Sequence, residues 1–446
     1  MLLLKNKFKE VYFGFIPNHW ELDSMQNLSE LVTDYVANGS FASLKENVKY
    51  NDFEDYAVLI RLADFNNNFQ GNFVYISEDS YEFLSKTKLF GDEIIISNVG
   101  ANLGTVFKCP FLKYKMSLGP NSILVKMKGI DDFYYYWFKS IYGQFMLDTI
   151  VSGSAQPKFN KTDFRNILVP VPPINEQIVI SRTLKEIDNT INITEKINEN
   201  LINLTKVIYK SWFENFTALE NCEFIDSEIG KIPKDWHVVE LSSFIKIYNG
   251  YSYTSDELEE STCAMATIKN FNRNGGFKSN GFKEIVYSEK IKDHHFLKKN
   301  DVLVSCTDVT QEAEIIANSV LLLSKLDYEE IIMSMDLVKV ESTIPEINNF
   351  LLNSILDSYR FKMFSLGYVN GTTVLHLDKN VFNDFKIALP YDLSILKGIN
   401  DSLESIFTQI SYNFEKIQKL SELRNYILPK LMSGEIDVSE INCNLD

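Results

Sequence analysis

Two short loops combine small residues with side chains that can form hydrogen bonds to the edges of nucleobases. The first reads Ser-Gly-Ser-Ala-Gln-Pro-Lys over residues 152–158, and the second reads Asn-Gly-Thr-Thr over residues 370–373 and continues to His376. Glutamine can pair bidentately with adenine, serine and threonine can reach either kind of base, and lysine can address guanine or a phosphate. The loops therefore favour recognition of nucleic acid, although a solvated loop without a ligand has the same composition.

Lysines are concentrated in two stretches that also contain glycine and asparagine. No acidic residue occurs between Ile94 and Ile130, whereas five lysines do. In the second half of the chain a series of lysines follows Gly275-Gly276. Glycines let the backbone approach a ligand closely. The residues that we predict to bind DNA are Asn98, Asn102, Lys108, Lys113, Lys115, Ser154, Gln156, Lys158, Lys278, Lys283, Lys290, Lys292, Thr372, Thr373 and His376.

We expect no catalytic residue and no metal site in this chain. It contains neither of the glycine-rich loops that cradle nucleotide phosphates. None of its five histidines forms a His-x-x-x-His pair or has a cysteine at metal-ligand spacing. The five cysteines are odd in number and far apart, which is typical of reduced thiols in a cytoplasmic protein. No run of about 18 apolar residues occurs, so we also expect no membrane span.

The net charge of the chain limits how it can bind nucleic acid. Its 44 Lys and Arg residues are outnumbered by 60 Asp and Glu residues, which gives a formal charge of −16. Binding to phosphates depends on Lys and Arg, so most of this surface repels a DNA duplex. Either the protein binds no nucleic acid, or it uses small basic patches while a partner supplies most of the positive charge.

Several segments occur twice in the same order. Gly-Phe-Ile-Pro-Asn-His-Trp at 14–20 returns as Gly-Lys-Ile-Pro-Lys-Asp-Trp at 230–236, and the loop at residue 152 returns at residue 370. A duplication of this length predicts two similar modules with approximate twofold symmetry, which suits a twofold partner such as duplex DNA. Short runs of β-forming residues and aromatic-rich helices near 132–149 and 345–364 predict a mixed α/β or α+β domain in each module.

Each module is followed by a long apolar repeat. Nine residues from Ile180 to Ile208 recur with a mean step of 28/8 = 3.5 residues, and nine from Ile399 to Ile427 repeat the pattern. This is the period of a coiled coil, and at about 1.5 Å per residue the first helix is roughly 60 Å long. Two matching seams predict that the two helices pair. The residues predicted at helix–helix or subunit interfaces are Ile187, Ile191, Leu201, Leu204, Trp212, Phe213, Ile406, Ile410, Leu420, Leu423 and Leu431.

The order of these segments resembles the specificity subunit of type I restriction-modification systems, over essentially the whole chain. The resemblance rests on Leu-Val-Pro-Val-Pro-Pro-Ile-Asn-Glu-Gln at 168–177, Tyr-Lys-Ser-Trp-Phe at 209–213, Ile-Leu-Pro-Lys-Leu-Met-Ser-Gly-Glu-Ile at 427–436 and the two Ile-Pro-x-x-Trp segments. The start of the second helix departs from the pattern, because Leu389-Pro390-Tyr-Asp-Leu lacks the second proline and the Glu-Gln pair. Its first residue is therefore uncertain by several positions.

The resemblance implies two target-recognition domains, at 1–172 and 217–390, each reading one half of a split double-stranded DNA site. It also implies two helical regions, at 173–216 and 391–446, that pack as an antiparallel coiled coil, set the spacing and dock two modification methyltransferase subunits. Those subunits carry S-adenosylmethionine and methylate adenine, and ATP- and Mg²⁺-dependent restriction subunits join the full complex, so this chain itself needs no cofactor. The alternatives are the specificity partner of a fused methylase–nuclease of type IIB or IIG and, from another class, a coiled-coil protein–protein adaptor.

Overall fold

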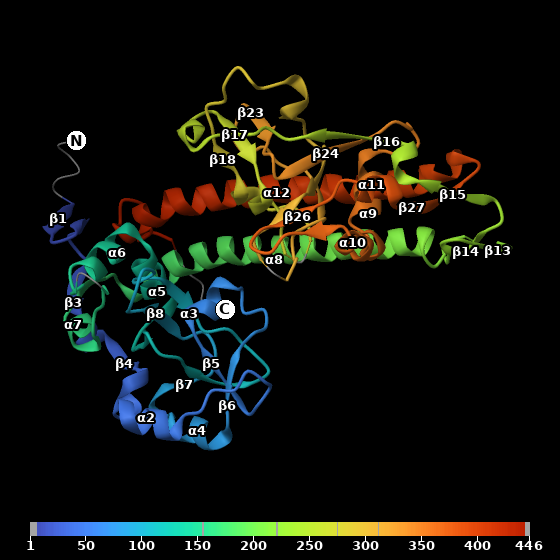
Figure 1. Ribbon diagram of the computed structural model, residues 1–446. Helices are drawn as coiled ribbons and strands as arrows, with labels where there is room; N and C mark the ends of the chain where they lie inside the picture. The colour runs from blue at the N-terminus through green and yellow to red at the C-terminus, as the bar shows by residue number, and fades with distance from the viewer. Residues whose placement is uncertain (1–6, 154–155, 220–221, 274, 311, 442–446) are drawn as a thin grey trace. The chain divides into compact units, whose positions relative to one another are not determined.

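The computed structural model describes residues 7–153, 156–219, 222–273, 275–310 and 312–441. The chain forms two units, of which the first comprises Met1–Thr190 with Ser421–Asp446 and the second Ile191–Leu420. Figure 1 shows two long helices, α8 (Ile174–Phe213) and α12 (Lys397–Met432). The division falls inside both of them. Each unit therefore contains part of each long helix, whereas the sequence interpretation treated the helices as regions of their own.

Unit 1 is built on two four-stranded sheets. The first has the order β6 (Val74–Ile76), β5 (Ala57–Ile60), β10 (Lys115–Leu118) and β7 (Lys88–Leu89), and the second has the order β4 (Ser29–Asp34), β11 (Ser122–Met127), β8 (Ile94–Ser97) and β9 (Val106–Lys108). Strands β5 and β10 pair in parallel and the other neighbours are antiparallel. Two short ribbons complete the unit: β1 (Phe8–Val11) with β2 (Gly14–Pro17), and β3 (Glu21–Ser24) with β12 (Leu168–Val171).

Short helices cover these sheets. They are α1 (Met25–Leu28), η1 (Tyr35–Asn38), α2 (Phe41–Asn47), α3 (Leu62–Asn66), α4 (Glu78–Phe83), η2 (Ser85–Thr87), α5 (Asp131–Lys139), α6 (Ile141–Asp148) and α7 (Lys161–Arg165). The core that α5 enters contains the fully buried rings of Phe133, Trp137 and Phe138. The helix predicted over 132–149 is in fact α5 and α6, because the Ser140 hydroxyl accepts a hydrogen bond from the Gly143 amide and starts a new helix.

Unit 2 repeats this topology. Its four-stranded sheets have the orders β18 (Lys283–Glu284), β17 (Cys263–Ala266), β23 (Glu330–Met333), β19 (Phe296–Leu297) and β16 (Ile245–Asn249), β24 (Leu337–Ser342), β20 (Val302–Ser305), β22 (Ser319–Leu321). The ribbons are β13 (Phe224–Ser227) with β14 (Gly230–Pro233) and β15 (Trp236–Glu240) with β27 (Lys386–Pro390). Again the pair equivalent to β5 and β10 is the parallel one. The prediction of two similar mixed α/β modules is confirmed.

A further small sheet in unit 2 joins β21 (Thr307–Asp308), β26 (Leu375–Leu377) and β25 (Val369–Asn370). The helices of the unit are η3 (Leu241–Ser243), η4 (Ser255–Glu257), η5 (Ile268–Asn270), η6 (Ser279–Gly281), η7 (Asp293–His295), α9 (Asn349–Leu356), α10 (Tyr359–Leu366), α11 (Val381–Asp384) and η8 (Leu393–Leu396). The helix predicted over 345–364 is likewise divided, since the Ser358 hydroxyl caps the first turn of α10. Because η8 precedes α12, the second long helix begins at Lys397.

The two Ile-Pro-x-x-Trp segments pack where long helices end. In unit 1 the Trp20 Nε1 donates to Glu176 Oε2 at 2.8 Å, and the ring also lies beside Gly434, just beyond α12. In unit 2 the Trp236 ring meets the Phe213 ring at the end of α8, with centroids 5.5 Å apart. The segments that carry the family resemblance therefore fix the start of each sheet domain to a helix end.

Within each unit the long helices contact one another through polar side chains. In unit 1, Arg424 Nη1 lies 2.8 Å from Asp188 Oδ1. In unit 2, Asn413 Nδ2 donates to Asn198 Oδ1 at 2.7 Å, and both side chains are buried. These contacts do not by themselves establish a coiled coil.

The buried stripe of α8 in unit 2 differs from the predicted seam. Of the predicted seam, Thr194 is buried but Ile197 and Leu204 are 45% and 44% exposed. Asn198 and Thr205, which lie outside the predicted seam, are buried. A straight α-helix has 3.6 residues per turn, so its buried face drifts by about 20° per heptad relative to a 3.5-residue pattern. The drift turns two of the predicted apolar positions outward and brings polar ones in.

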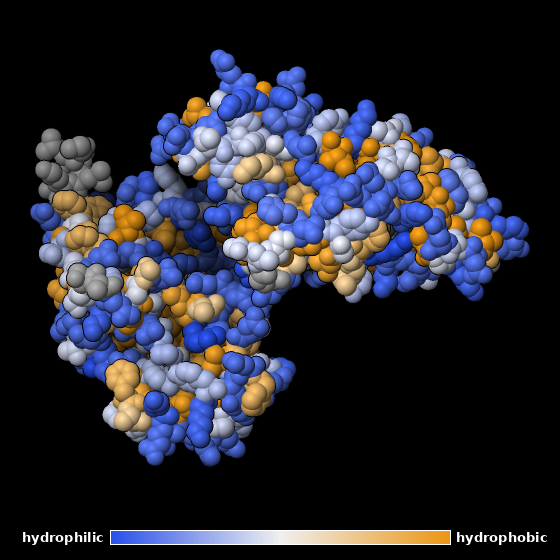
Figure 2. Space-filling view, viewed as in Figure 1, coloured by the Kyte–Doolittle hydropathy of each residue, from blue (hydrophilic) through white to orange (hydrophobic). Residues whose placement is uncertain are grey.

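The surface of each unit mixes polar and apolar side chains. On the face that Figure 2 presents, orange apolar residues lie scattered among blue hydrophilic ones over both units. Among the described residues no helix combines the length and apolar character that crossing a membrane requires.

Candidate nucleic-acid interface

In unit 1 the loop of residues 152–158 is pinned to the end of β8. Val99 and Ser152 both form β-bridges with Lys158. The Gly100 amide donates to the Pro157 carbonyl at 3.0 Å, and the Phe159 amide donates to the Asn98 carbonyl at 3.1 Å. Two regions that are distant in sequence, residues 98–100 and the two sides of the loop at 152 and 156–159, thus form one small surface. It brings together three of the predicted DNA-binding residues: Asn98, Gln156 and Lys158.

A groove of about 870 Å³ opens beside this surface. Its lining combines the ring residues Tyr35, Phe41, Tyr50 and Phe159 with the apolar residues Val36, Leu44, Val48, Val99 and Pro120 and with Asp34, Lys45, Asn98, Asn121, Ser122, Ser152, Gln156, Lys158 and Asn160. Among the described residues of the lining Asp34 is the one that carries a carboxylate, and Lys161 Nζ lies 2.9 Å from its Oδ1. The two lysines of the lining therefore face no unneutralised acid within the groove.

Unit 2 builds the equivalent surface from strands β21, β26 and β25. Thr307 and Asn370 both pair with His376, as Val99 and Ser152 pair with Lys158. His376 therefore occupies the position of Lys158, 218 residues further along the chain. The side chain of His376 is exposed, as are those of Thr372 and Thr373 in the preceding turn. The topology thus places three predicted residues of unit 2 on the counterpart of the unit 1 surface.

The loop that follows β21 is held from inside by two charged side chains. The Asp308 carboxylate accepts hydrogen bonds from the amides of Thr310, Ile315 and Ile316 at 2.7–3.2 Å. Burial opposes ionisation of Asp308, but these donors outweigh it and lower the pKa of the carboxyl. Lys362 Nζ donates to the Ala313 carbonyl at 2.9 Å and to Asn318 Oδ1 at 2.8 Å, and burial lowers its pKa to about 8.

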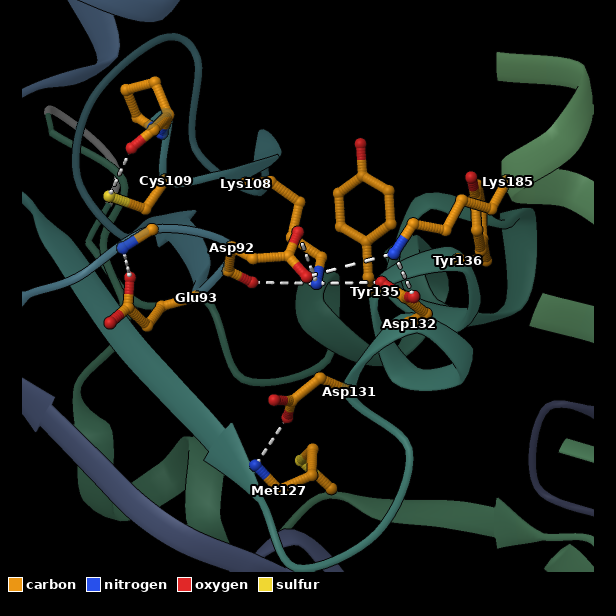
Figure 3. A network of polar contacts seen from close by, with 12 residues as sticks. Asp92, Glu93, Lys108, Cys109, Met127, Asp131, Asp132, Tyr135, Tyr136 and Lys185 are labelled. Atoms are coloured by element: carbon orange, nitrogen blue, oxygen red, sulfur yellow. Dashed lines mark hydrogen bonds and ion pairs between the residues drawn. The ribbon is translucent and has the colours of Figure 1, made fainter. Parts of the chain in front are cut away.

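Lys108, which we predicted to bind DNA, is instead held inside unit 1 (Figure 3). Its Nζ lies 3.0 Å from Asp132 Oδ1 and 3.4 Å from Asp92 Oδ1, and Lys185 Nζ lies 2.7 Å from the other oxygen of Asp132. Burial opposes ionisation of Asp132, but the hydrogen bonds from Lys185 and Lys108 outweigh it and hold the pKa of the carboxyl below its ordinary value. The network ties β9 and α5 to α8, so Lys108 has a structural role.

Three other candidates of unit 1 lie away from the groove. Lys115 opens β10, whereas the groove residues Pro120 and Asn121 follow the opposite end of that strand. Lys113 is exposed and lies 3.3 Å from Glu54. Asn102 is exposed, and its carbonyl accepts from the Thr105 hydroxyl. Ser154 lies outside the described residues.

The predicted lysines of unit 2 belong to the other sheet and its loops. Lys283 lies on β18, where its Nζ is 5.9 Å from the centre of the Tyr253 ring. Lys278 is exposed before η6, and Lys290 and Lys292 are exposed before η7. None of the four is in β21, β26 or β25. The structure therefore does not bring them together with His376.

The predicted interface residues of the long helices have mixed environments. In unit 1, Leu431 is buried, Ile187 is partly buried and Leu423 is exposed. In unit 2 the side chains of Ile191, Phe213 and Ile410 are buried, those of Leu201, Trp212, Ile406 and Leu420 are partly buried, and Leu204 is exposed. Buried positions serve the units themselves, and the exposed ones remain available to a partner.

Sequence reasoning did not find the groove residues Phe41 and Tyr50, nor the roles of Asp308 and Lys362 in holding the loop after β21. The sequence did contain one signal for Phe41 and Tyr50, which is the length of the segment that carries them. Between β4 and β5 unit 1 has 22 residues (35–56), whereas between β16 and β17 unit 2 has 13 (250–262). A comparison of the two copies in sequence shows this insertion. Within the described residues no cluster of His, Cys, Asp or Glu can hold a metal ion.

Comparison with known proteins finds one class of protein to which this chain is similar. Residues 25–203 match the model of the type I restriction modification DNA specificity domain. The resemblance predicted from the sequence is confirmed: the chain is similar to type I restriction enzyme specificity subunits.

Particular relatives match over nearly the whole chain. The type I restriction enzyme MjaIX specificity subunit of Methanocaldococcus jannaschii is 24% identical over 450 residues, which cover 98% of each chain. The MjaVIII specificity subunit of the same organism is 25% identical over 454 residues, with the same coverage. Among solved structures, the S subunit of a type I restriction-modification system from M. genitalium has a TM-score of 0.50 at 14% identity, covering 93% of this chain and 96% of that one. This last likeness shows that the fold is shared.

Proposed function

We propose that the chain is the noncatalytic DNA sequence-recognition subunit of a type I restriction-modification complex, and that each of its two sheet domains reads one half of a bipartite site. The observation that carries the proposal is the pair of equivalent surfaces, one centred on Lys158 and the other on His376. The same backbone arrangement presents different side chains in the two units. Two different half-sites require such a pair of surfaces, because direct readout depends on the side chains.

The two long helices set the distance between the reading domains, as an antiparallel coiled coil, and dock two modification methyltransferase subunits. Contacts between α8 and α12 in each unit support the pairing: Asp188 with Arg424, and Asn198 with Asn413. Exposed apolar residues on α8 support the docking, because apolar side chains that share one exposed face of a helix suit a partner surface. These residues are Ile193, Ile197, Leu204 and Val207, which are 44–64% exposed.

The partners supply the chemistry and most of the positive charge. S-adenosylmethionine is bound by the modification subunits, which methylate adenine, and ATP and Mg²⁺ are bound by the restriction subunits. The chain itself has a net charge of −16. Among the described residues that line the groove of unit 1, the cationic side chains are Lys45 and Lys158. The lone chain therefore binds DNA weakly, and addition of the modification subunit produces tight, salt-sensitive binding.

Mapping of methylated adenine tests the proposal. A host that carries the gene of the matching modification subunit is sequenced with and without this chain. The proposal predicts methylated adenines in a split motif only when the chain is present. If the methylated motif is the same without the chain, or if no adenine is methylated with it, the proposal is wrong.

A further inference from the structure

The groove beside Lys158 is lined in part by a connection that is longer in unit 1 than in unit 2. The longer connection between β4 and β5 folds into η1 and α2, and it contributes Tyr35, Phe41, Leu44 and Tyr50 to the lining. The connection between β4 and β5 has 22 residues, and the corresponding connection between β16 and β17 in unit 2 has 13, which is nine fewer. The longer connection is thus an addition to the duplicated reading surface.

Its rim and floor suit the face of a flat ring. Phe41 and Tyr50 stand at the rim and are 83% and 53% exposed. The Tyr50 hydroxyl donates to the Tyr35 hydroxyl at 3.2 Å, which holds its ring against the insertion. Leu44, Val48 and Phe159 form a buried apolar floor. Such large exposed rings at the mouth of an apolar groove cost solvation unless a ligand covers them.

The polar groups of the groove suit a nucleotide. Lys45 and Lys158 can form ion pairs with a phosphate group. The carboxylate of Asp34, which belongs to the described lining, is neutralised by Lys161. The Asn98 amide is oriented by its Nδ2, which donates to the Phe159 carbonyl at 3.0 Å. Its Oδ1 is buried and has no hydrogen-bond partner among the described residues. This acceptor is closed to solvent and makes no contact available to a ligand in the groove.

A base that stays in the duplex cannot use these groups together. In the double helix only the edges of a base pair are accessible, and its faces are covered by stacking. The ring face becomes available to Phe41 and Tyr50 only when the base leaves the stack. A volume of about 870 Å³ accommodates a whole nucleotide, since small-ligand pockets span roughly 300–1,000 Å³.

We propose that this groove binds one unpaired nucleobase that projects from the DNA duplex, with its ring on Phe41 and Tyr50 and its phosphate near Lys158. The inference rests on the proposed DNA-recognition function. It concerns a site on this chain and is separate from methylation of adenine by a partner subunit.

A DNA hairpin with a single bulged base tests the proposal without knowledge of the target sequence. The bulged base is 2-aminopurine, and the reference hairpin is identical but lacks the bulge. Binding of the full chain to each hairpin is measured at low salt, where sequence-independent binding is strongest. Base–aromatic stacking predicts that the bulged hairpin binds at least about fivefold more tightly, with quenched 2-aminopurine fluorescence.

Three variants locate the effect. Phe41→Ala removes a ring that is 83% exposed, and it is expected to abolish the preference for the bulge while leaving the unfolding midpoint unchanged. Tyr50→Phe keeps the ring and is expected to retain the preference. Phe53→Ala is the matched control, because Phe53 is 67% exposed in unit 1 but does not line the groove.

Equal binding of the two hairpins overturns the inference and leaves the DNA-recognition function standing. The same holds if Phe53→Ala lowers the preference as much as Phe41→Ala does, because the effect is then not specific to the groove. If the full chain binds neither hairpin at low salt, the DNA-binding function fails and this inference fails with it.

Discussion

The buried asparagine pair of unit 2 gives a stability prediction that the structure makes quantitative. Asn198 and Asn413 are each 5% exposed, and Asn413 Nδ2 donates to Asn198 Oδ1 at 2.7 Å. Replacing one by alanine removes that hydrogen bond and leaves the other amide buried without its partner. A buried group in this state costs about 1–3 kcal/mol. Each single variant, Asn198→Ala or Asn413→Ala, is therefore expected to lower the free energy of unfolding by that amount.

The double variant separates pairing from simple loss of side-chain volume. After the first substitution the second removes the group that was left unpaired, so the two losses are not additive. The double alanine variant is expected to lose about 1 kcal/mol less than the sum of the single losses. Ile197→Ala is the control on the same helix, because that side chain is 45% exposed and a surface change costs within about 0.5 kcal/mol.

Thermal unfolding of the full chain measures these differences. For a unit of this size, 1 kcal/mol corresponds to a change of about 2–4 °C in Tm. Two results would refute the assignment of these residues as a buried pair that fixes the contact between α8 and α12. One is single variants with the Tm of the native protein, and the other is a double variant whose loss of free energy of unfolding equals the sum of the two single losses.

Three further predictions concern other contacts. Glu176→Ala removes the carboxylate that accepts from the buried Trp20 Nε1, and a hydrogen bond to a charged group contributes about 1.5–3 kcal/mol, so urea unfolding should show a loss of that size while Glu176→Gln recovers part of it. Burial raises the pKa of Asp357 from 3.8 to about 6, so the folded protein keeps a proton on this carboxyl that the unfolded chain loses near pH 4. The free energy of unfolding of unit 2 should therefore fall as the pH rises from about 4 to about 6. The variant Asp357→Asn should not show this fall. With the modification subunit present, Lys158→Ala should reduce the slope of log K against log salt by about 1. Lys113→Ala should leave the slope unchanged, because Lys113 is exposed, precedes β10 and lies away from the groove.

The duplication could be predicted from the sequence because the repeated Ile-Pro-x-x-Trp segments make equivalent packing contacts in both units. Trp20 and Trp236 each pack at the end of a long helix, so the segments around them stay recognisable. The loop residues Lys158 and His376 were found for the same reason, since each is held by two neighbouring strands or bridges. Local patterns therefore predicted two similar mixed α/β modules, but not the order of their strands.

Features that depend on distant partners could not be predicted in this way. Lys108 lies in a stretch free of acidic residues, yet Asp132 on α5 and Asp92 before β8 reach it in space. The helix seam failed at Ile197 and Leu204 because the apolar repeat and the turn of a straight helix differ slightly in period. The groove of unit 1 depends on an insertion whose side chains meet residues some hundred positions away, such as Lys158.

The most direct test of two independent reading domains is exchange of one of them. Residues 1–172 are replaced by the first domain of another type I specificity subunit, and the methylated adenines of a host with the matching modification subunit are then mapped. We predict that one half of the split motif changes while the other half and the spacing remain. A motif that is unchanged, or one in which both halves change together, contradicts the central claim.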